Sequence, residues 1–201
     1  MTIKSVYDDQ QEIIKSIMHL CGIERFDADL TFGNGQFWKN IEKPVFRFDI
    51  DDTLNDLTSA CSSTQTPLND KSVSSVMFDP PFLTYVRQGR EGNGRMIMSN
   101  RFSGYWRYDE LAEHYQQTAK EAARVIKKGG IFVVKCQDII HNHKMHCTHV
   151  NMIQWCSEWF RLKDLFVLPA KHRLPSPNRA GTQKHARIFH SYFLVFERNA
   201  K

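Results

Sequence analysis

Residues 26–35 have the sequence Phe26-Asp27-Ala28-Asp29-Leu30-Thr31-Phe32-Gly33-Asn34-Gly35. The run before the first glycine is typical of a short strand, and the glycines end it at once. Residues 36–41 continue with an apolar spacing that predicts a helix. Because glycine has no side chain and tolerates positive φ, a ligand can approach the backbone of this turn closely. The stretch therefore predicts a strand, a glycine turn and a helix, with a tight turn that holds no ligand as the alternative.

Further apolar runs extend this beginning into a sheet. Strands are expected at residues 44–50, 74–79, 131–135, 164–168 and 191–196, and helices at residues 8–21, 108–128 and 150–160. Strands that alternate with helices favour a parallel sheet, whereas no long helix separates the last two strands. We therefore expect an α/β fold with a mostly parallel sheet and an antiparallel edge.

The composition is that of one globular domain. The chain has 201 residues, of which 41% are hydrophobic and 24% charged, so we expect residues 1–201 to form a single domain. Its five cysteines form no CxxC pair, which excludes a regular zinc ribbon and disfavours a disulfide framework. Because residues 1–9 lack a signal pattern and no run reaches about 20 apolar residues, we expect a cytoplasmic protein without a membrane anchor.

Asp79-Pro80-Pro81-Phe82 directly follows one of the predicted strands. Each proline lacks a backbone N–H and restricts the residue before it, so the tetrapeptide is a stiff rim with a carboxylate, carbonyl oxygens and one ring. An incoming amino group can donate its hydrogens to Asp79 and to the Pro80 carbonyl, while Phe82 stacks on a base. The motif therefore predicts Asp79, Pro80, Pro81 and Phe82 as catalytic residues, and a chance turn is the alternative.

Asp49 stands at the end of the strand expected at residues 44–50. The carboxyl ends of parallel strands open onto the ligand crevice of a sheet, and an acid there can accept hydrogen bonds from a ribose diol. Asp49 is therefore a candidate ligand-binding residue, with a solvated aspartate at a strand end as the alternative.

The formal net charge of +5 favours a polyanionic partner. Residues 83–108 interleave arginines with aromatic residues, a combination that suits phosphates and bases, and we expect this segment to be a substrate-binding loop. A second basic loop is expected at residues 170–187. The residues predicted to bind nucleic acid are Tyr85, Arg87, Arg90, Arg95, Arg101, Trp106, Lys171 and Arg173. Solvated basic loops whose aromatic rings pack on the body of the protein are the alternative.

The glycine turn, Asp49 and the Asp-Pro-Pro-Phe motif, in this order, resemble the class I S-adenosylmethionine-dependent amino-methyltransferases of the N6-adenine and N4-cytosine DNA type. The resemblance covers residues 26–135 and, more loosely, residues 189–196. It implies a Rossmann-like class I methyltransferase fold with a mostly parallel seven-stranded sheet and an antiparallel C-terminal edge strand. It also implies that S-adenosylmethionine is held by Asp29, Thr31, Phe32, Gly33, Gly35, Asp49 and Asp79.

The same resemblance implies site-specific methylation of DNA on an exocyclic amine. Adenine N6 is favoured over cytosine N4, and RNA is an open alternative, because one rim serves all three. The target base must leave its stack or be single-stranded. Two features depart from the family. No sizeable target-recognition domain is expected, and the interval from Asp49 to Asp79 is short, which leaves Asp70 as the candidate for the acid beside the cofactor's adenine.

Two other functions compete. Residues 49–54, Asp-Ile-Asp-Asp-Thr-Leu, resemble the nucleophile loop of haloacid-dehalogenase-type phosphatases, but no paired aspartates follow to complete a magnesium site. A zinc-binding nucleic-acid module would use a different group, His141, His143, His146, Cys147 and His149 with the flanking Cys136 and Cys156. Their spacing matches no regular zinc pattern, so we expect unligated histidines in a polar loop and no metal.

Overall fold

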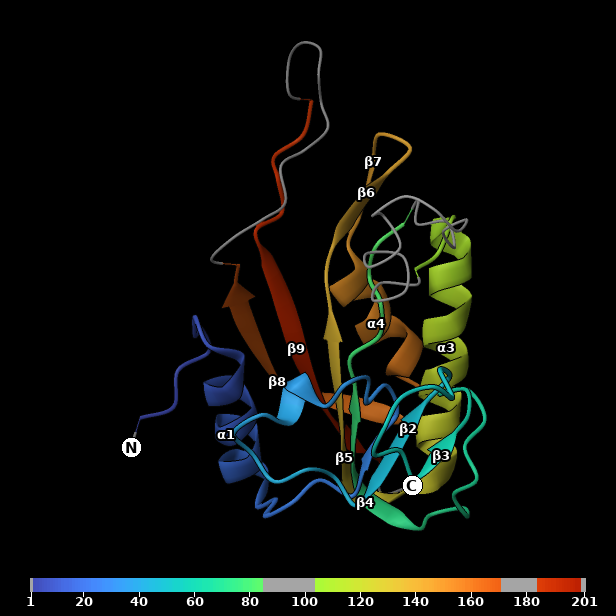
Figure 1. The fold of residues 1–201 in the computed structure, drawn as a ribbon. Helices are drawn as coiled ribbons and strands as arrows, with labels where there is room; N and C mark the ends of the chain where they lie inside the picture. Colours follow the sequence, from blue (N-terminus) through green and yellow to red (C-terminus); the bar gives the residue numbers. More distant parts are fainter. Residues whose placement is uncertain (1, 85–103, 171–183, 200–201) are drawn as a thin grey trace.

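The sheet of the computed structural model has seven strands in the order β3-β2-β1-β4-β5-β9-β8 (Figure 1). The structure describes residues 2–84, 104–170 and 184–199. The strands are β1 (Ala28–Asp29), β2 (Phe46–Asp49), β3 (Ser59–Ala60), β4 (Val73–Phe78), β5 (Ile126–Cys136), β8 (Phe160–Pro169) and β9 (His190–Arg198). The strands from β3 through β5 in this order pair in parallel, and β9 is antiparallel to both β5 and β8.

This arrangement confirms the predicted mostly parallel, seven-stranded sheet with an antiparallel C-terminal strand. The position of that strand differs from the expectation, because β9 lies between β5 and β8 and the edge is formed by β8. The reason is visible in the burial pattern: four consecutive residues of β9, 193–196, are buried. A strand that is apolar on both faces is most stable inside a sheet, with neighbours on both sides.

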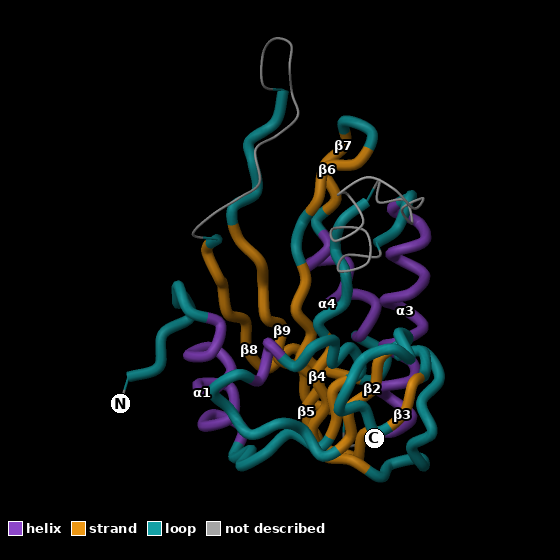
Figure 2. The backbone as a smooth tube through the Cα atoms, viewed as in Figure 1, coloured by secondary structure: helices purple, strands orange, loops and turns teal. Residues whose placement is uncertain are grey.

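Helices cover both faces of the sheet (Figure 2). α1 (Gln10–Cys21) packs with Met77 and Val133 on one face, whereas α3 (Tyr108–Val125) and α4 (Thr148–Cys156) pack with Phe78 and Val134 on the other. Successive residues of β4 and β5 therefore alternate between two cores, as the geometry of a strand requires. Within the described residues, no helix is both long enough and apolar enough to cross a membrane.

The helix boundaries show where contacts in the fold override the pattern of the sequence. α1 begins after the cap Asp9 and ends at Gly22 in the left-handed region, close to the predicted 8–21. The predicted end of the helix at residue 128 is wrong. α3 ends at Val125, because Ile126 already pairs with Val73 of β4. The helix expected at residues 36–41 is only a 3₁₀ turn, η1 (Gln36–Trp38). The histidines expected in a polar loop lie partly in a hairpin, formed by β6 (Ile139–His141) and β7 (Lys144–His146).

The turn between β1 and η1 is held by Asp29, which is only 1% exposed. Trp38 Nε1 donates to Asp29 Oδ2 at 2.6 Å, and the Thr31 N–H donates to Asp29 Oδ1 at 2.9 Å. Burial raises the pKa of Asp29 to about 7; the hydrogen bonds from Thr31 and Trp38 oppose this rise, and the nearby carboxylates of Asp79 and Asp49 add to it. Asp29 therefore orders the turn at the cost of a buried carboxyl that is difficult to ionise.

This pKa predicts how the stability of the Asp29→Asn variant depends on pH. A carboxyl whose pKa is raised on folding contributes stability at low pH that is lost as the pH rises to the folded pKa. Between about pH 4 and pH 7 the wild type should therefore lose on the order of 4 kcal/mol relative to Asp29→Asn, which does not titrate. Urea unfolding of both proteins across this range measures the difference. A difference in unfolding free energy that is constant with pH would contradict the assignment.

Candidate active site

Three carboxylates meet at the carboxyl edge of the sheet, one from each of β1, β2 and β4. Asp29 ends β1 and is in register with Arg47 of β2 and Met77 of β4. Asp49 lies two residues beyond Arg47, at the end of β2, and Asp79 lies two residues beyond Met77, directly after β4. Both therefore lie beyond Asp29 at the same edge of the sheet. This is the edge at which parallel α/β sheets bind their ligands.

Thr31 connects the glycine turn to the Asp-Pro-Pro-Phe motif. Its N–H donates to the Asp29 carboxylate, and its Oγ1 accepts a hydrogen bond of 2.8 Å from the backbone N–H of Asp79. The Leu30 N–H donates to the Met77 carbonyl at 3.0 Å, which continues the pairing of the two strands up to this point. Two motifs that are 48 residues apart in the sequence therefore lie in contact.

Gly33 and Asp49 form the part of the turn that is open to a ligand. The Gly33 N–H donates to Asp49 Oδ2 at 2.9 Å, which joins the turn to the end of β2. Gly33 has a φ of 55°, and a side chain added there would meet nothing within 4 Å, so its backbone faces open space. A left-handed glycine beside an acid, in open space at a strand end, fits a ligand that carries hydroxyl or amino donors.

Gly35 and Phe32 lie differently. A Cβ on Gly35 would be 3.0 Å from Phe32 Cζ, so this glycine is needed because the ring packs directly against it. Phe32 is 3% exposed and belongs to the core on the α1 side of the sheet. These two residues support the turn from within, and their contact with a cofactor stays a prediction.

The Asp79 carboxylate is partly exposed and is paired with Lys135. Lys135 Nζ lies 3.3 Å from Asp79 Oδ2 and donates to Gln10 Oε1 of α1 at 2.8 Å. Burial raises the pKa of Asp79, and the charge and hydrogen bond of Lys135 oppose the rise. Lys135 did not emerge from the sequence analysis, although a signal was present: it is the one charged residue that directly follows the apolar run 131–134.

The proline rim is held from α3. The Tyr115 hydroxyl donates to the Pro81 carbonyl at 3.3 Å, and Tyr115 itself is fully buried. Pro80 is buried, whereas Pro81 and Phe82 are partly exposed. The four residues of the motif thus form a supported edge with one carboxylate and one ring accessible from outside.

His114 forms a polar cluster behind this rim that the sequence did not predict. It contacts the edge of Phe78 at 5.7 Å between ring centroids, and it hydrogen-bonds Ser63 Oγ at 2.7 Å and the Tyr105 hydroxyl. Burial lowers the pKa of His114 to about 4, so the ring is neutral at physiological pH. The cluster joins α3 to the chain between β3 and β4 and to the segment that leads into α3.

Two groups of predicted site residues are placed elsewhere. The interpretation of Asp70 as the acid beside the cofactor's adenine is wrong, because Asp70 precedes β4, at the opposite edge of the sheet, and bonds Arg124 at 2.7 Å. Of the residues predicted to bind nucleic acid, the structure describes Trp106, which is 41% exposed just before α3. The others, Tyr85, Arg87, Arg90, Arg95, Arg101, Lys171 and Arg173, lie outside the described residues.

The competing functions gain no support from the geometry. Among the described residues, no group of three His, Cys, Asp or Glu side chains could hold a metal ion. Cys136 and Cys156 are buried in the core, and His149 Nδ1 is bonded to Asp138 at 2.7 Å. In the segment that resembles a phosphatase loop, the Asp51 carboxylate accepts hydrogen bonds from its own neighbour Thr53.

Comparisons with known proteins bear on the fold. No protein-family model and no curated protein matches the chain. Among solved structures, a candidate sarcosine dimethylglycine methyltransferase from Galdieria sulphuraria is similar with a TM-score of 0.58 and 13% identity, over 94% of this chain and 84% of that one. A candidate type 11 methyltransferase from Sulfolobus solfataricus has a TM-score of 0.53 and 16% identity, over 96% of this chain and 94% of that one.

A third similar structure is a candidate DNA modification methylase from Thermus thermophilus. It has a TM-score of 0.43 and 14% identity over 67% of this chain, which spans 48% of that protein's length. The order of the strands and the two likenesses that extend over nearly the whole chain establish the architecture. The chain has the Rossmann-like fold that class I methyltransferases also have.

Proposed function

We propose that this chain is an S-adenosylmethionine-dependent methyltransferase that methylates an exocyclic amino group of a nucleic-acid base, with adenine N6 of DNA as the preferred target. One contact carries the proposal: the hydrogen bond from the Asp79 N–H to Thr31 Oγ1. It supports a single site in which a glycine turn open to a ligand adjoins a carboxylate that can accept an amine.

The cofactor fits the first part of this site. Gly33 leaves its backbone open to a ligand, and Asp49 at the end of β2 can accept hydrogen bonds from a ribose diol. Asp29 and Thr31 would act by holding the turn, because the Asp29 carboxylate is buried and already bonded. When bound, S-adenosylmethionine supplies an activated methyl group.

The rim would hold and align the amine. Asp79 and the Pro80 carbonyl accept hydrogen bonds from the two N–H groups of the amine, which orients the nitrogen lone pair toward the methyl donor. The Phe82 ring stacks on the base. With the donor bound, methyl transfer would form the nitrogen–carbon bond as the donor's sulfur–methyl bond breaks and S-adenosylhomocysteine leaves, and positive charge would develop on the nitrogen. The ionised Asp79 carboxylate stabilises that charge and accepts the proton that the nitrogen loses. Alignment and charge stabilisation supply the catalysis, and the protein forms no covalent intermediate.

The substrate class is tested by following the methyl group. The protein is incubated with isotopically labelled S-adenosylmethionine and, in separate reactions, duplex DNA, single-stranded DNA, RNA or sarcosine. Nucleic acids are digested, and the labelled product is identified by mass spectrometry. We expect label in N6-methyldeoxyadenosine. Label found only in sarcosine or in no product would overturn the proposal, and label in N4-methylcytosine or in RNA would replace its preferred target.

Removal of the Asp79 carboxylate should stop methyl transfer without loss of the cofactor. The proposed mechanism assigns Asp79 to the amine and not to the cofactor, unlike the cofactor role that the resemblance also implied for it, so we expect Asp79→Ala to lower kcat by about 100-fold or more. The Kd for S-adenosylmethionine, measured by calorimetry, should stay within about two-fold of the wild type. Asp52→Ala is the matched control, since it removes an exposed carboxylate near the same edge of the sheet and should leave kcat unchanged. Full activity of Asp79→Ala would contradict the mechanism.

Loss of Lys135 should move the pH dependence of the reaction. The Lys135 ammonium opposes the rise in the pKa of Asp79, so Lys135→Met lets that pKa rise further. Because the ionised carboxylate is the active form, the acid limb of kcat against pH should shift to higher pH. Lys135→Arg keeps the charge and should restore much of the wild-type profile. Lys128→Met, an exposed position at the other end of β5, serves as the control, and an unshifted profile in Lys135→Met would exclude this role.

A further inference from the structure

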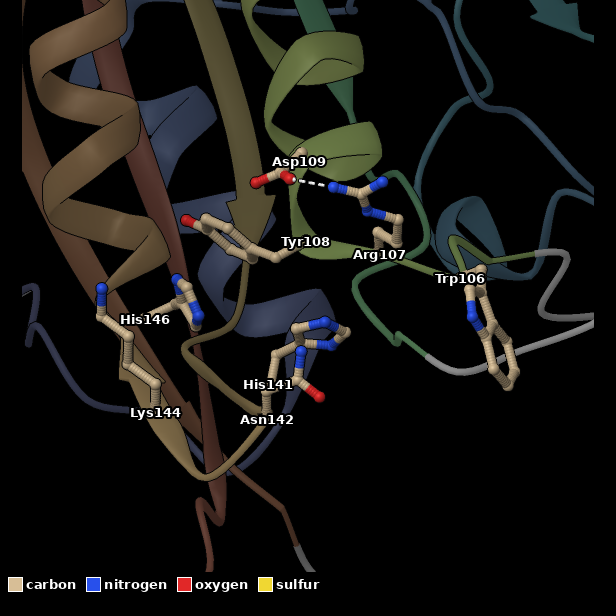
Figure 3. A pocket seen from close by; sticks show the side chains of 8 residues that line it. All are labelled: Trp106, Arg107, Tyr108, Asp109, His141, Asn142, Lys144 and His146. Carbon is tan, nitrogen blue, oxygen red and sulfur yellow. Dashed lines mark hydrogen bonds and ion pairs between the residues drawn. The ribbon is translucent and has the colours of Figure 1, made fainter.

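A pocket of about 500 Å³ lies between the start of α3 and the β6–β7 hairpin (Figure 3). Its size is within the usual range for small-molecule sites. The residues that matter for its chemistry are Trp106, Arg107 and Tyr108 from the start of α3 and His141, Lys144 and His146 from the hairpin. Two segments far apart in the sequence therefore form one concave surface.

One wall of this pocket is aromatic. The rings of Tyr108 and His146 are stacked, with 3.8 Å between centroids and 30° between planes. Tyr108 is fixed from behind by Asn151, whose Nδ2 donates to the Tyr108 hydroxyl at 2.7 Å. Trp106, which also lines the pocket, is 41% exposed. Tyr108 is 8% exposed and supports the His146 ring from within, so His146 and Trp106 are the rings available for stacking a planar group.

The rim of the pocket is cationic. The lining contains two basic side chains, Arg107 and Lys144, and one carboxylate, Asp109. Arg107 is paired with Asp109 at 2.9 Å, but their side chains are 65% and 78% exposed, so water screens the pair and the guanidinium remains able to bind another anion. Positive charge beside aromatic rings is the combination by which proteins bind a base and its phosphate together.

The pocket is joined to the Asp-Pro-Pro-Phe rim by Thr84. The Thr84 hydroxyl hydrogen-bonds His141 Nδ1 at 3.2 Å, and Thr84 forms a β-bridge with Tyr105, just before Trp106. Thr84 is two residues beyond Phe82, and two extended residues span at most about 7 Å. The pocket therefore adjoins the segment that directly follows the place proposed for the target base.

We propose that this pocket binds the DNA nucleotide next to the target base, with its base on the Trp106 and His146 rings and its phosphate at Lys144 and Arg107. The inference rests on the proposed function, because it assigns a second position on the same polynucleotide. It also supplies a means of holding the substrate strand beside the Asp-Pro-Pro-Phe rim.

The charge in the pocket is tested by the salt dependence of DNA binding. Binding of a fluorescein-labelled single-stranded oligodeoxynucleotide is followed by anisotropy over a range of salt concentrations. Lys144→Ala should weaken binding and reduce the slope of log K against log salt by about 0.7, the effect of one lost phosphate contact on a single strand. Lys120→Ala, an exposed lysine on α3 outside the pocket, should change neither quantity.

The stacking part is tested separately with Trp106→Ala. It should weaken binding by about ten-fold and leave the salt slope unchanged, because a ring contributes stacking but no charge. Affinity and slope equal to the wild type in both variants, on DNA that the wild type binds, would overturn the pocket alone. If the variants weaken binding but the wild type transfers no methyl group to DNA, the pocket stands and the proposed function fails. If the wild type does not bind DNA, both are overturned.

Discussion

The hydrogen bond from the Asp79 N–H to Thr31 Oγ1 is the contact on which the whole site depends. Thr31 is itself bonded to the buried carboxylate of Asp29, so a short chain of three residues joins the ends of β1 and β4. The Gly33 N–H extends this chain to Asp49 and the end of β2. A glycine turn and a proline-framed carboxylate thereby become neighbours at one edge of the sheet.

Three neighbouring carboxylates repel one another when they are ionised, and the structure reduces this cost in a different way at Asp29 and at Asp79. Asp29 is buried and has its pKa raised to about 7, whereas the partly exposed Asp79 is paired with Lys135. The Asp29 carboxyl therefore orders the backbone of the turn, and the Asp79 carboxylate is kept near a cation at the accessible rim. This division explains why Lys135, anchored to α1 through Gln10, matters to the site although it belongs to no recognised motif.

Most of the sheet could be predicted because strand patterns are local. The apolar runs that form β4, β5 and β9 can be recognised in the sequence, and they are buried in the structure. Asp49 ends the run that forms β2, and Asp79 directly follows the run that forms β4. β3 could not be predicted, since its two residues, Ser59 and Ala60, carry no pattern. The end of α3 could not be predicted either, because it is set by the pairing of Ile126 with Val73. The contact between Gln10 and Lys135 joins residues that are 125 positions apart, so no short stretch of sequence indicates it.

A structure with S-adenosylhomocysteine bound tests the central claim most directly. The claim is that the glycine turn holds the methyl donor and that Asp79 faces the atom from which the methyl group departs. We expect the ligand to lie over Gly33, with its ribose hydroxyls at Asp49 and its sulfur turned toward the Asp79 carboxylate. A ligand bound at another edge of the sheet, or with its sulfur turned away from Asp79, would contradict the account.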